Sequence, residues 1–471
     1  MNEELKAKAE RLVRELDVPL LKREGLLTLK DLFFPSVHYP PITMYPPVKE
    51  EELFRGYTLP ADGFFDIYVH LPFCMKYCAF CHYPVKLGEQ AEEKDRYLAA
   101  LEKEMDLYMA RLGIKKFKAR SILFGGGTPT YLTPAQLARN LDFFRVRVDI
   151  SSRPQFSYDV DPVTITDADG PERLRIMLEH GVDRLTIGLQ SLDDALLKTM
   201  NRHHDAAAAM RSVKVAKDAG FKVNVELIYG YPGQTLECWA DSLEKAAALG
   251  AEEVQIYRLK VVPYGDHTGA ITRKFGVKRE EFLGVEETLA MKVYAAAFLP
   301  TAGYNENLAR VFSRSRVDFS RYAHDQCCNL QDQVGFGLTA FSSLRDRFGL
   351  NTQSFEEYYS LIAAGRLPLN RGLVRTPEDQ LRWSVVLPLK NRMVIKNYFK
   401  RLTGREVGEV FGPKIERLKS YGLLTEDEKF LSLTEKGRII ADDICHQFHS
   451  PGYVPFPREA YSAGGLCPYN E

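Results

Sequence analysis

The stretch that decides the fold is YVHLPFCMKYCAFC, residues 68–81, which contains three closely spaced cysteines. They are Cys74, Cys78 and Cys81, in the spacing C-x3-C-x2-C. The residues around the start of this stretch, FFDIYVHLP (64–72), predict a β-strand, so the cysteines stand on a loop that follows a strand. Soft thiolates at this spacing suit zinc or an iron–sulfur cluster.

The three thiolates leave one metal position open. No fourth Cys or His follows at the spacing of a zinc finger, and His82 is too close to Cys81 in sequence to bind the same ion. Structural zinc sites are closed by protein ligands, whereas sites that do chemistry keep a position open. The pattern therefore favours a catalytic cluster, with a structural zinc ion as the alternative.

The composition is that of a neutral globular protein. Among 471 residues, 63 are Lys or Arg and 63 are Asp or Glu, so no basic excess favours nucleic acid or an anionic membrane as partner. No apolar run approaches the roughly 18 residues of a membrane helix. The charged N-terminus has no secretory signal. We expect a cytoplasmic protein whose eight cysteines form no disulfide framework.

Strand and helix patterns alternate along the chain beyond the cysteines. Amphipathic segments such as 94–113, 172–181 and 206–220 predict helices between apolar runs that predict strands. About six such units predict an α/β fold with parallel strands wrapped by helices, as a complete or a partial barrel. The later predicted strands are SILFGGG (121–127), QFSYDVDP (155–162), RLTIGLQS (184–191), KVNVELIYGYPG (222–233) and EEVQIYRL (252–259).

Polar residues stand near the ends of three of these strands. They are Asp159, Gln190 and Glu226. In parallel α/β folds, ligands bind at the carboxyl ends of the strands. We therefore expect these side chains to contribute to a binding site.

Three segments lie outside this alternation. The stretch 33–54 contains five prolines and predicts an extended arm that lies across the next domain or covers an active-site mouth. Residues 378–450 predict helices around a hairpin, which is typical of a small winged-helix-like domain; without a basic stripe, a packing or lid role is favoured over DNA binding. The aromatic tail 450–471 predicts either a disordered end or a segment that folds back over the active-site opening.

The cysteine pattern, with the aromatic Phe80 before the last cysteine, resembles the signature of radical S-adenosylmethionine (SAM) enzymes. The resemblance implies a [4Fe–4S] cluster held by the three thiolates, with SAM on the fourth iron. Reductive cleavage of SAM then yields a 5′-deoxyadenosyl radical. The motif GGGTPT (125–130) adds to the resemblance, because glycines let a ligand approach the backbone closely.

Further motifs are similar to those of the oxygen-independent coproporphyrinogen III oxidase family. This resemblance covers about residues 60 to 450. It implies a partial (β/α)6 TIM-like barrel with an N-terminal arm and a C-terminal winged-helix-like domain. In chain order the motifs are YVHLPFC (68–74), GGGTPTYL (125–132), DVDP (159–162), IGLQS (187–191), Asn201-Arg202, ELIYGYPGQT (226–235), VGFGLTAF (334–341) and LTEKGR (433–438).

The same resemblance assigns residues to the cofactors. Tyr68 and Phe80 are placed beside the cluster and the adenine. Gln190 and Arg202 match family residues near the ribose and carboxylate of SAM. The methionyl part of SAM is assigned to Gly125, Gly126, Gly127 and Thr128.

Two carboxylates exchange their family identities. Asp159 stands where the family usually has Glu, and Glu226 stands where it usually has Asp. Both still offer a carboxylate to SAM, with a reach altered by one methylene. The resemblance makes these two and Tyr68 the predicted catalytic residues, and it also implies a second SAM beside the first.

Two other departures bear on the reaction. The family's oxidases carry a fourth cysteine two residues past the third, where this chain has Tyr83. They also carry an arginine in a PRYTSYP-like arm, where this chain has Ile42. A substrate with several propionates requires cationic partners, and the arm supplies none until Lys49.

These departures favour one-carbon transfer, in which a second SAM serves to methylate or cyclopropanate an sp2 carbon of an organic substrate. The alternatives are a porphyrinogen oxidase or other tetrapyrrole-modifying enzyme, and a non-catalytic haem chaperone. The expected partners are an aromatic or tetrapyrrole substrate and a flavodoxin- or ferredoxin-type electron donor. We expect a monomer, with no nucleic-acid or membrane partner.

The predicted organisation has five parts. They are an N-terminal helix and arm (1–60), the radical SAM partial barrel (61–300), a barrel extension (301–375), the C-terminal winged-helix-like domain (376–450) and the aromatic tail (451–471).

Overall fold

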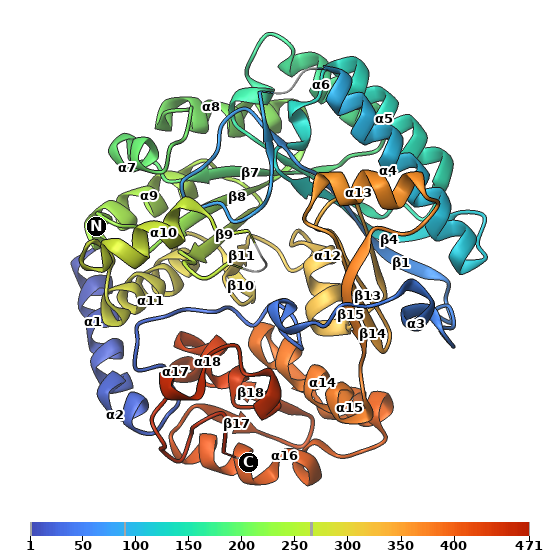
Figure 1. Cartoon of the computed structure of the whole chain (residues 1–471). Coiled ribbons are helices and arrows are strands. Elements are labelled where there is room, and N and C mark those ends of the chain that lie inside the picture. The colour runs from blue at the N-terminus through green and yellow to red at the C-terminus, as the bar shows by residue number, and fades with distance from the viewer. Residues whose placement is uncertain (1, 89–90, 264–266, 471) are drawn as a thin grey trace.

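The computed structural model describes residues 2–88, 91–263 and 267–470. Its centre is a set of parallel strands that follow one another across a sheet in the order β1, β4, β6, β7, β8 and β9 (Figure 1). Their bounds are β1 Phe64–Leu71, β4 Phe117–Gly126, β6 Gln155–Val160, β7 Arg184–Gln190, β8 Lys222–Tyr229 and β9 Glu253–Arg258.

Helices connect these strands and cover the sheet, as parallel strands require a crossover. The apolar residues of these strands form the core of the barrel. Leu185, Ile187 and Leu189, for example, alternate along β7 and are fully buried. The predicted α/β fold with a partial (β/α)6 barrel is confirmed. The principal connecting helices are α4 Ala91–Leu112, α5 Pro134–Arg147, α6 Gly170–Glu179, α7 Asp194–Thr199, α8 Ala206–Asp218, α9 Leu236–Ala248, α10 Ala270–Val277 and α11 Val285–Thr301.

Short strands extend both edges of this sheet, which the loosened sequence pattern after residue 300 did not predict. At one edge β12 pairs parallel to β1, and β13, β14 and β15 follow as antiparallel neighbours. At the other edge β11 and then β10 pair antiparallel beyond β9. The bounds are β10 Asn305–Leu308, β11 Val311–Ser313, β12 Gln333–Phe336, β13 Phe341–Leu344, β14 Arg347–Asn351 and β15 Leu369–Val374.

The C-terminal part forms a separate antiparallel sheet, in the order β16, β18, β17, with helices around it. This arrangement agrees with the predicted winged-helix-like domain, and it lies below the open side of the barrel in Figure 1. The bounds are α14 Pro377–Asn391, β16 Met393–Ile395, α15 Lys396–Thr403, α16 Val407–Ser420, β17 Leu424–Glu426, β18 Phe430–Leu433, α17 Glu435–Ile439 and α18 Ala441–His446.

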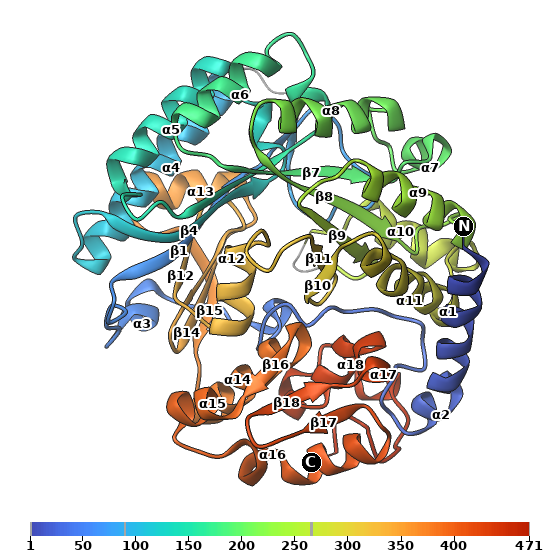
Figure 2. The ribbon, with the colours of Figure 1, turned by 180° about the vertical axis from the view of Figure 1, so that it is seen from behind.

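The N-terminal arm runs between the barrel and the C-terminal domain, and both views show this course (Figures 1 and 2). It follows helices α1 (Glu3–Leu16) and α2 (Val18–Arg23). The backbone of Ser36 anchors it: its N–H donates to Asp442 (2.8 Å), and its carbonyl accepts from Lys390 Nζ (3.1 Å). A buried ion pair between Lys390 and Asp442 (2.8 Å) therefore fastens the arm to the C-terminal domain.

The C-terminal tail packs against the N-terminal segment. The Leu466 N–H donates to the Glu24 carbonyl (2.6 Å), and Phe456 meets the Phe34 ring edge to face at 6.0 Å. Cys467 is buried in the same apolar cluster. Of the two predicted alternatives, the tail folds back, but it supports the arm from outside rather than reaching the active cavity described below.

No described helix has the length and apolar character needed to cross a membrane. The remaining short elements are α3 Glu50–Phe54, β2 Phe73–Cys74, β3 Lys86–Leu87, β5 Val148–Asp149, α12 Arg321–His324 and α13 Phe355–Ala363. The boundaries between the five predicted parts of the chain stay predictions.

Candidate active site

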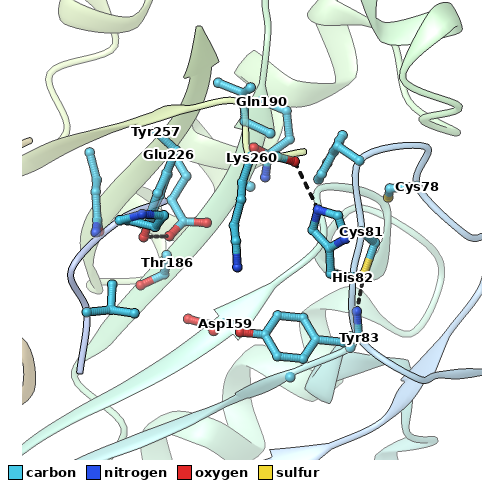
Figure 3. A pocket seen from close by; sticks show the side chains of 18 of the residues that line it. Cys78, Cys81, His82, Tyr83, Asp159, Thr186, Gln190, Glu226, Tyr257 and Lys260 are labelled. Atoms are coloured by element: carbon cyan, nitrogen blue, oxygen red, sulfur yellow. Dashed lines mark hydrogen bonds between the residues drawn. The ribbon is translucent and has the colours of Figure 1, made fainter. Parts of the chain in front are cut away.

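A cavity of about 590 Å³ lies at the carboxyl ends of the parallel strands. All the site residues predicted from the sequence line it, except Gly125. The cysteine loop follows β1 on one side, and Asp159, Gln190 and Glu226 project from β6, β7 and β8 on the other (Figure 3). The expectation that ligands bind at the carboxyl ends of parallel strands therefore located the cavity correctly. The individual roles of these residues stay predictions.

The three cysteine thiols lie on one wall of the cavity. Burial, with a smaller contribution from the neighbouring thiols, raises the pKa of Cys74 to about 12 and that of Cys81 to about 11. Among the described residues, no three His, Cys, Asp or Glu side chains surround a point that would suit a single metal ion. An iron–sulfur cluster instead takes one soft thiolate per iron, and this donor set fits it.

Polar groups of the protein are directed at each sulfur. The Thr128 hydroxyl donates to Cys74 Sγ (3.7 Å), and the Tyr83 N–H donates to Cys81 Sγ (3.4 Å). Hydrogen bonds to cysteine sulfurs tune iron–sulfur clusters. These contacts therefore suit cluster thiolates, which carry negative charge.

Arg202, whose side chain is largely buried, donates a hydrogen bond to the third sulfur, that of Cys78. Its Nη1 donates to Cys78 Sγ (3.1 Å), and its Nη2 donates to Asp161 (2.8 Å) and to the Gly188 carbonyl (3.0 Å). Burial alone would raise the pKa of Asp161, but the Arg202 guanidinium and His203 hold it well below its usual range. Asp161 therefore stays ionised and orients Arg202, a role that the sequence did not assign although Asp161 belongs to the DVDP motif.

The glycine motif is required for protein packing, while its predicted contact with SAM stays a prediction. A Cβ on Gly125 would lie 2.5 Å from Asp159 Oδ2, and one on Gly127 would lie 2.6 Å from the Phe73 carbonyl. Gly126 has φ +115° and its missing Cβ would meet the His70 ring at 2.8 Å. Glycine is thus required to bring the end of β4 against the cysteine loop.

Two half-buried carboxylates, those of Asp159 and Glu226, face the cavity on the side away from the cysteines. Burial raises the pKa of Asp159, and the Glu226 carboxylate raises it further. Burial also raises the pKa of Glu226, which accepts a hydrogen bond from the Tyr257 hydroxyl (3.0 Å). These acceptors are suited to ribose hydroxyls or an ammonium group.

Gln190 stands at a strained point of the cavity. Its φ of +65° lies in the left-handed region, where a residue with a side chain is unfavourable. A Cβ on Gly188 would lie 2.6 Å from Gln190 Nε2, so the glycine leaves room for the amide. The backbone of this strand end is held so that the Gln190 side chain lines the cavity.

Three cations that sequence reasoning missed also line this cavity: Arg258, Lys260 and Arg310. The first two come from the end of β9 and just beyond it, and the third from the β10–β11 turn. In Figure 3 the Lys260 side chain extends into the space between Glu226 and Tyr83. Burial lowers the pKa of Lys260 to about 5, so it would gain from a negatively charged ligand. The sequence did offer a signal for two of these cations, because Arg258 and Lys260 alternate with apolar residues at the end of a predicted strand.

The arm forms part of the cavity wall. Phe33, Pro35, Val37, His38 and Ile42 all line it. The arm thus lies across the barrel and also covers the site, which agrees with the second interpretation of its sequence. The Arg258 guanidinium lies over the Phe33 ring at 4.7 Å, a cation–π contact that joins the arm to the barrel.

Comparison with protein families gives two matches. Residues 68–246 match the radical SAM superfamily, and residues 376–440 match the HemN C-terminal domain. The first match contains the cysteine loop, the glycine motif and the strand ends that form the cavity. The second covers most of the winged-helix-like domain.

Proteins that are similar to this chain over most of its length include both a haem chaperone and an oxidase. The heme chaperone HemW of Bacillus subtilis is 28% identical, over 81% of this chain and 98% of its own length. The oxygen-independent coproporphyrinogen III oxidase of Escherichia coli is also 28% identical, over 81% of this chain and 84% of its own length.

A solved structure extends the likeness to the fold. Coproporphyrinogen III oxidase (HemN) from Escherichia coli, a radical SAM enzyme, aligns with a TM-score of 0.74 and 26% identity. The alignment covers 86% of this chain and 96% of that one. Fold, cavity and relatives agree: the chain contains a radical SAM domain and a HemN C-terminal domain, and over most of its length it is similar to oxygen-independent coproporphyrinogen III oxidases.

Proposed function

We propose that this radical SAM enzyme removes a hydrogen atom from a tetrapyrrole that carries carboxylates. The observation that carries the proposal is the group of cations, Arg258, Lys260 and Arg310, that lines the cavity together with the cysteine loop. Carboxylates of a bound substrate would pair with the two guanidinium groups and would favour protonation of Lys260, whose pKa is lowered to about 5 by burial. The oxidases among the relatives are named for a porphyrinogen substrate, which is consistent with this class.

The sequence pattern argued against such a substrate through the cations missing from the arm, and against the oxidase reaction through Tyr83 in place of a fourth cysteine. Ile42 does stand in the arm and lines the cavity, yet the barrel supplies basic residues to the same space. The two relatives and the solved structure compared above are named as oxidases or a haem chaperone. Tetrapyrrole chemistry therefore replaces one-carbon transfer as the favoured reaction.

Residues on different walls of the cavity would have different roles in the reaction. When bound, the cluster and SAM supply abstraction of hydrogen from an unactivated carbon. Arg202, held by Asp161, would stabilise the thiolate of Cys78, while Asp159 and Glu226 would accept hydrogen bonds from SAM.

The cations and the arm would handle the substrate. Lys260 and Arg258 would bind its carboxylates, and Phe33 and Val37 of the arm would exclude water from a reactive carbon radical. If that radical lies beside a propionate carboxylate, loss of carbon dioxide and of one electron to a separate one-electron acceptor leaves a vinyl group.

Three finer points remain part of the proposal. They are a second SAM molecule, a flavodoxin- or ferredoxin-type donor and a monomeric state. The cavity volume and the neutral overall charge are compatible with them.

The test is anaerobic turnover of the reconstituted protein with SAM, dithionite and coproporphyrinogen III. We expect 5′-deoxyadenosine together with carbon dioxide and a vinyl product. S-adenosylhomocysteine or methylthioadenosine as co-product would instead support one-carbon transfer. Haem binding without any cleavage of SAM would support a chaperone, and either result would overturn the proposal.

Replacing Lys260 with Met should lower kcat/KM for the carboxylate substrate about tenfold to a hundredfold, because a charge-assisted hydrogen bond contributes about 1.5–3 kcal/mol. SAM cleavage in the absence of substrate should change little. Lys115→Met, on the exposed surface, is the matched control. Equal turnover of both variants would show that Lys260 does not bind the substrate.

A further inference from the structure

A second cavity, of about 440 Å³, lies between the open edge of the barrel and the C-terminal domain. Helix α11 and the β10–β11 hairpin form its barrel side, while α1 contributes Lys8, and Arg392 and Arg438 come from the C-terminal domain. None of the residues predicted to bind the cluster or SAM lines this cavity. It is therefore separate from the site described above.

The lining of this second cavity is strongly basic. Cationic side chains outnumber carboxylates three to one, in a chain whose net charge is zero. Like charges that converge on one space repel each other unless an anion is bound there. The cations are Lys8, Lys292, Arg310, Arg316, Arg392 and Arg438, and the carboxylates are Glu306 and Glu435.

The protein offsets part of this charge, because the carboxylates of Asp442, Glu306 and Asp443 act on Lys292. Lys8 lies 3.9 Å from Glu435, and Lys292 Nζ donates to the carbonyls of Arg438 (2.7 Å) and Ile439 (2.9 Å). In the described parts of the chain, the guanidinium groups of Arg316, Arg392 and Arg438 make no ion pair or hydrogen bond. Three arginines are thus directed at one cavity with their charge available to a ligand.

We propose that this cavity binds a compact polyanion, such as a diphosphate group or a polycarboxylate. Guanidinium forks match phosphate and carboxylate oxygens in a bidentate way, and the volume accommodates a small molecule rather than a protein segment. The proposal is independent of the reaction assigned to the first cavity.

Arg310 connects the new site to the catalytic one, because it lines both cavities. It lies at the turn of the β10–β11 hairpin with φ +66°. Its guanidinium stacks over the Tyr257 ring at 4.7 Å, and Tyr257 in turn donates to Glu226. An anion in the second cavity would therefore contact Arg310, which also faces the side chains predicted to bind SAM, including the Glu226 carboxylate.

The test is calorimetric titration of the reconstituted holoprotein with inorganic pyrophosphate and, separately, with citrate. We expect saturable binding of one molecule of at least one of these probes. The double variant Arg392→Gln, Arg438→Gln should weaken that binding at least about tenfold, as expected for the loss of two charge-assisted contacts. Both side chains are exposed, so the variant should fold normally.

Two control variants test whether the probes bind in this cavity and not elsewhere on the protein. Arg211→Gln removes an exposed arginine on α8, and Lys260→Met removes a cation of the first cavity only. Both should keep the affinity of the wild type. Absence of saturable binding, unchanged affinity in the double variant, or loss of binding in Lys260→Met would each overturn the proposal.

Discussion

Replacement of Cys74, Cys78 or Cys81 with Ala is expected to abolish both the iron–sulfur cluster and SAM cleavage. The three thiols share one wall of the cavity, and the loop that carries them has no further cysteine. Each substitution removes the one protein ligand of an iron, so the cluster should not assemble stably. Iron and sulfide content, the brown absorbance and 5′-deoxyadenosine formation measure this loss, which should take activity below detection.

The matched control for these variants is Cys238→Ala. Cys238 lies on α9 and is a free, partly buried thiol that does not line the cavity. It should retain a full cluster and normal cleavage of SAM. A Cys78→Ala protein that keeps four irons and forms 5′-deoxyadenosine would refute the assignment of the cluster ligands.

Arg202→Met should destabilise the protein by about 3–5 kcal/mol, the usual cost of breaking a buried ion pair. The substitution leaves the Asp161 carboxylate, which is only 5% exposed, without its guanidinium partner. It also removes the donor to Cys78 Sγ, so the affinity for SAM should fall as well. Chemical denaturation of the anaerobic protein measures the first effect, and equilibrium SAM binding measures the second.

Two further variants test the cause of this loss. The double variant Arg202→Met, Asp161→Asn should recover part of the stability, because it removes a buried carboxylate that has lost its guanidinium partner and keeps only His203. Arg175→Met breaks an exposed pair with Glu172 on α6, and it should have little effect since solvent already screens that pair. If Arg202→Met and Arg175→Met were equally mild, the buried network would not hold the cysteine loop in place.

The reaction was the point at which sequence reasoning was least reliable. By the family resemblance Ile42 and Tyr83 depart from the oxidase pattern, and on that basis the missing arginine argues against a carboxylate-rich substrate. In the folded chain the Lys260 side chain enters the same cavity from just beyond the end of β9 (Figure 3). A count of cations within one segment could not include a residue brought there from more than two hundred positions away.

The sequence by itself determined the barrel, the cysteine loop and the strand ends at which ligands bind. These features depend on local patterns: alternation of strand and helix, the spacing of Cys74, Cys78 and Cys81, and the glycines after β4. Only the tertiary structure decided that the tail supports the arm, that Asp161 orients Arg202, and that a second basic cavity lies against the C-terminal domain. Each of these results from contacts between segments distant in sequence, which periodicity and spacing do not encode.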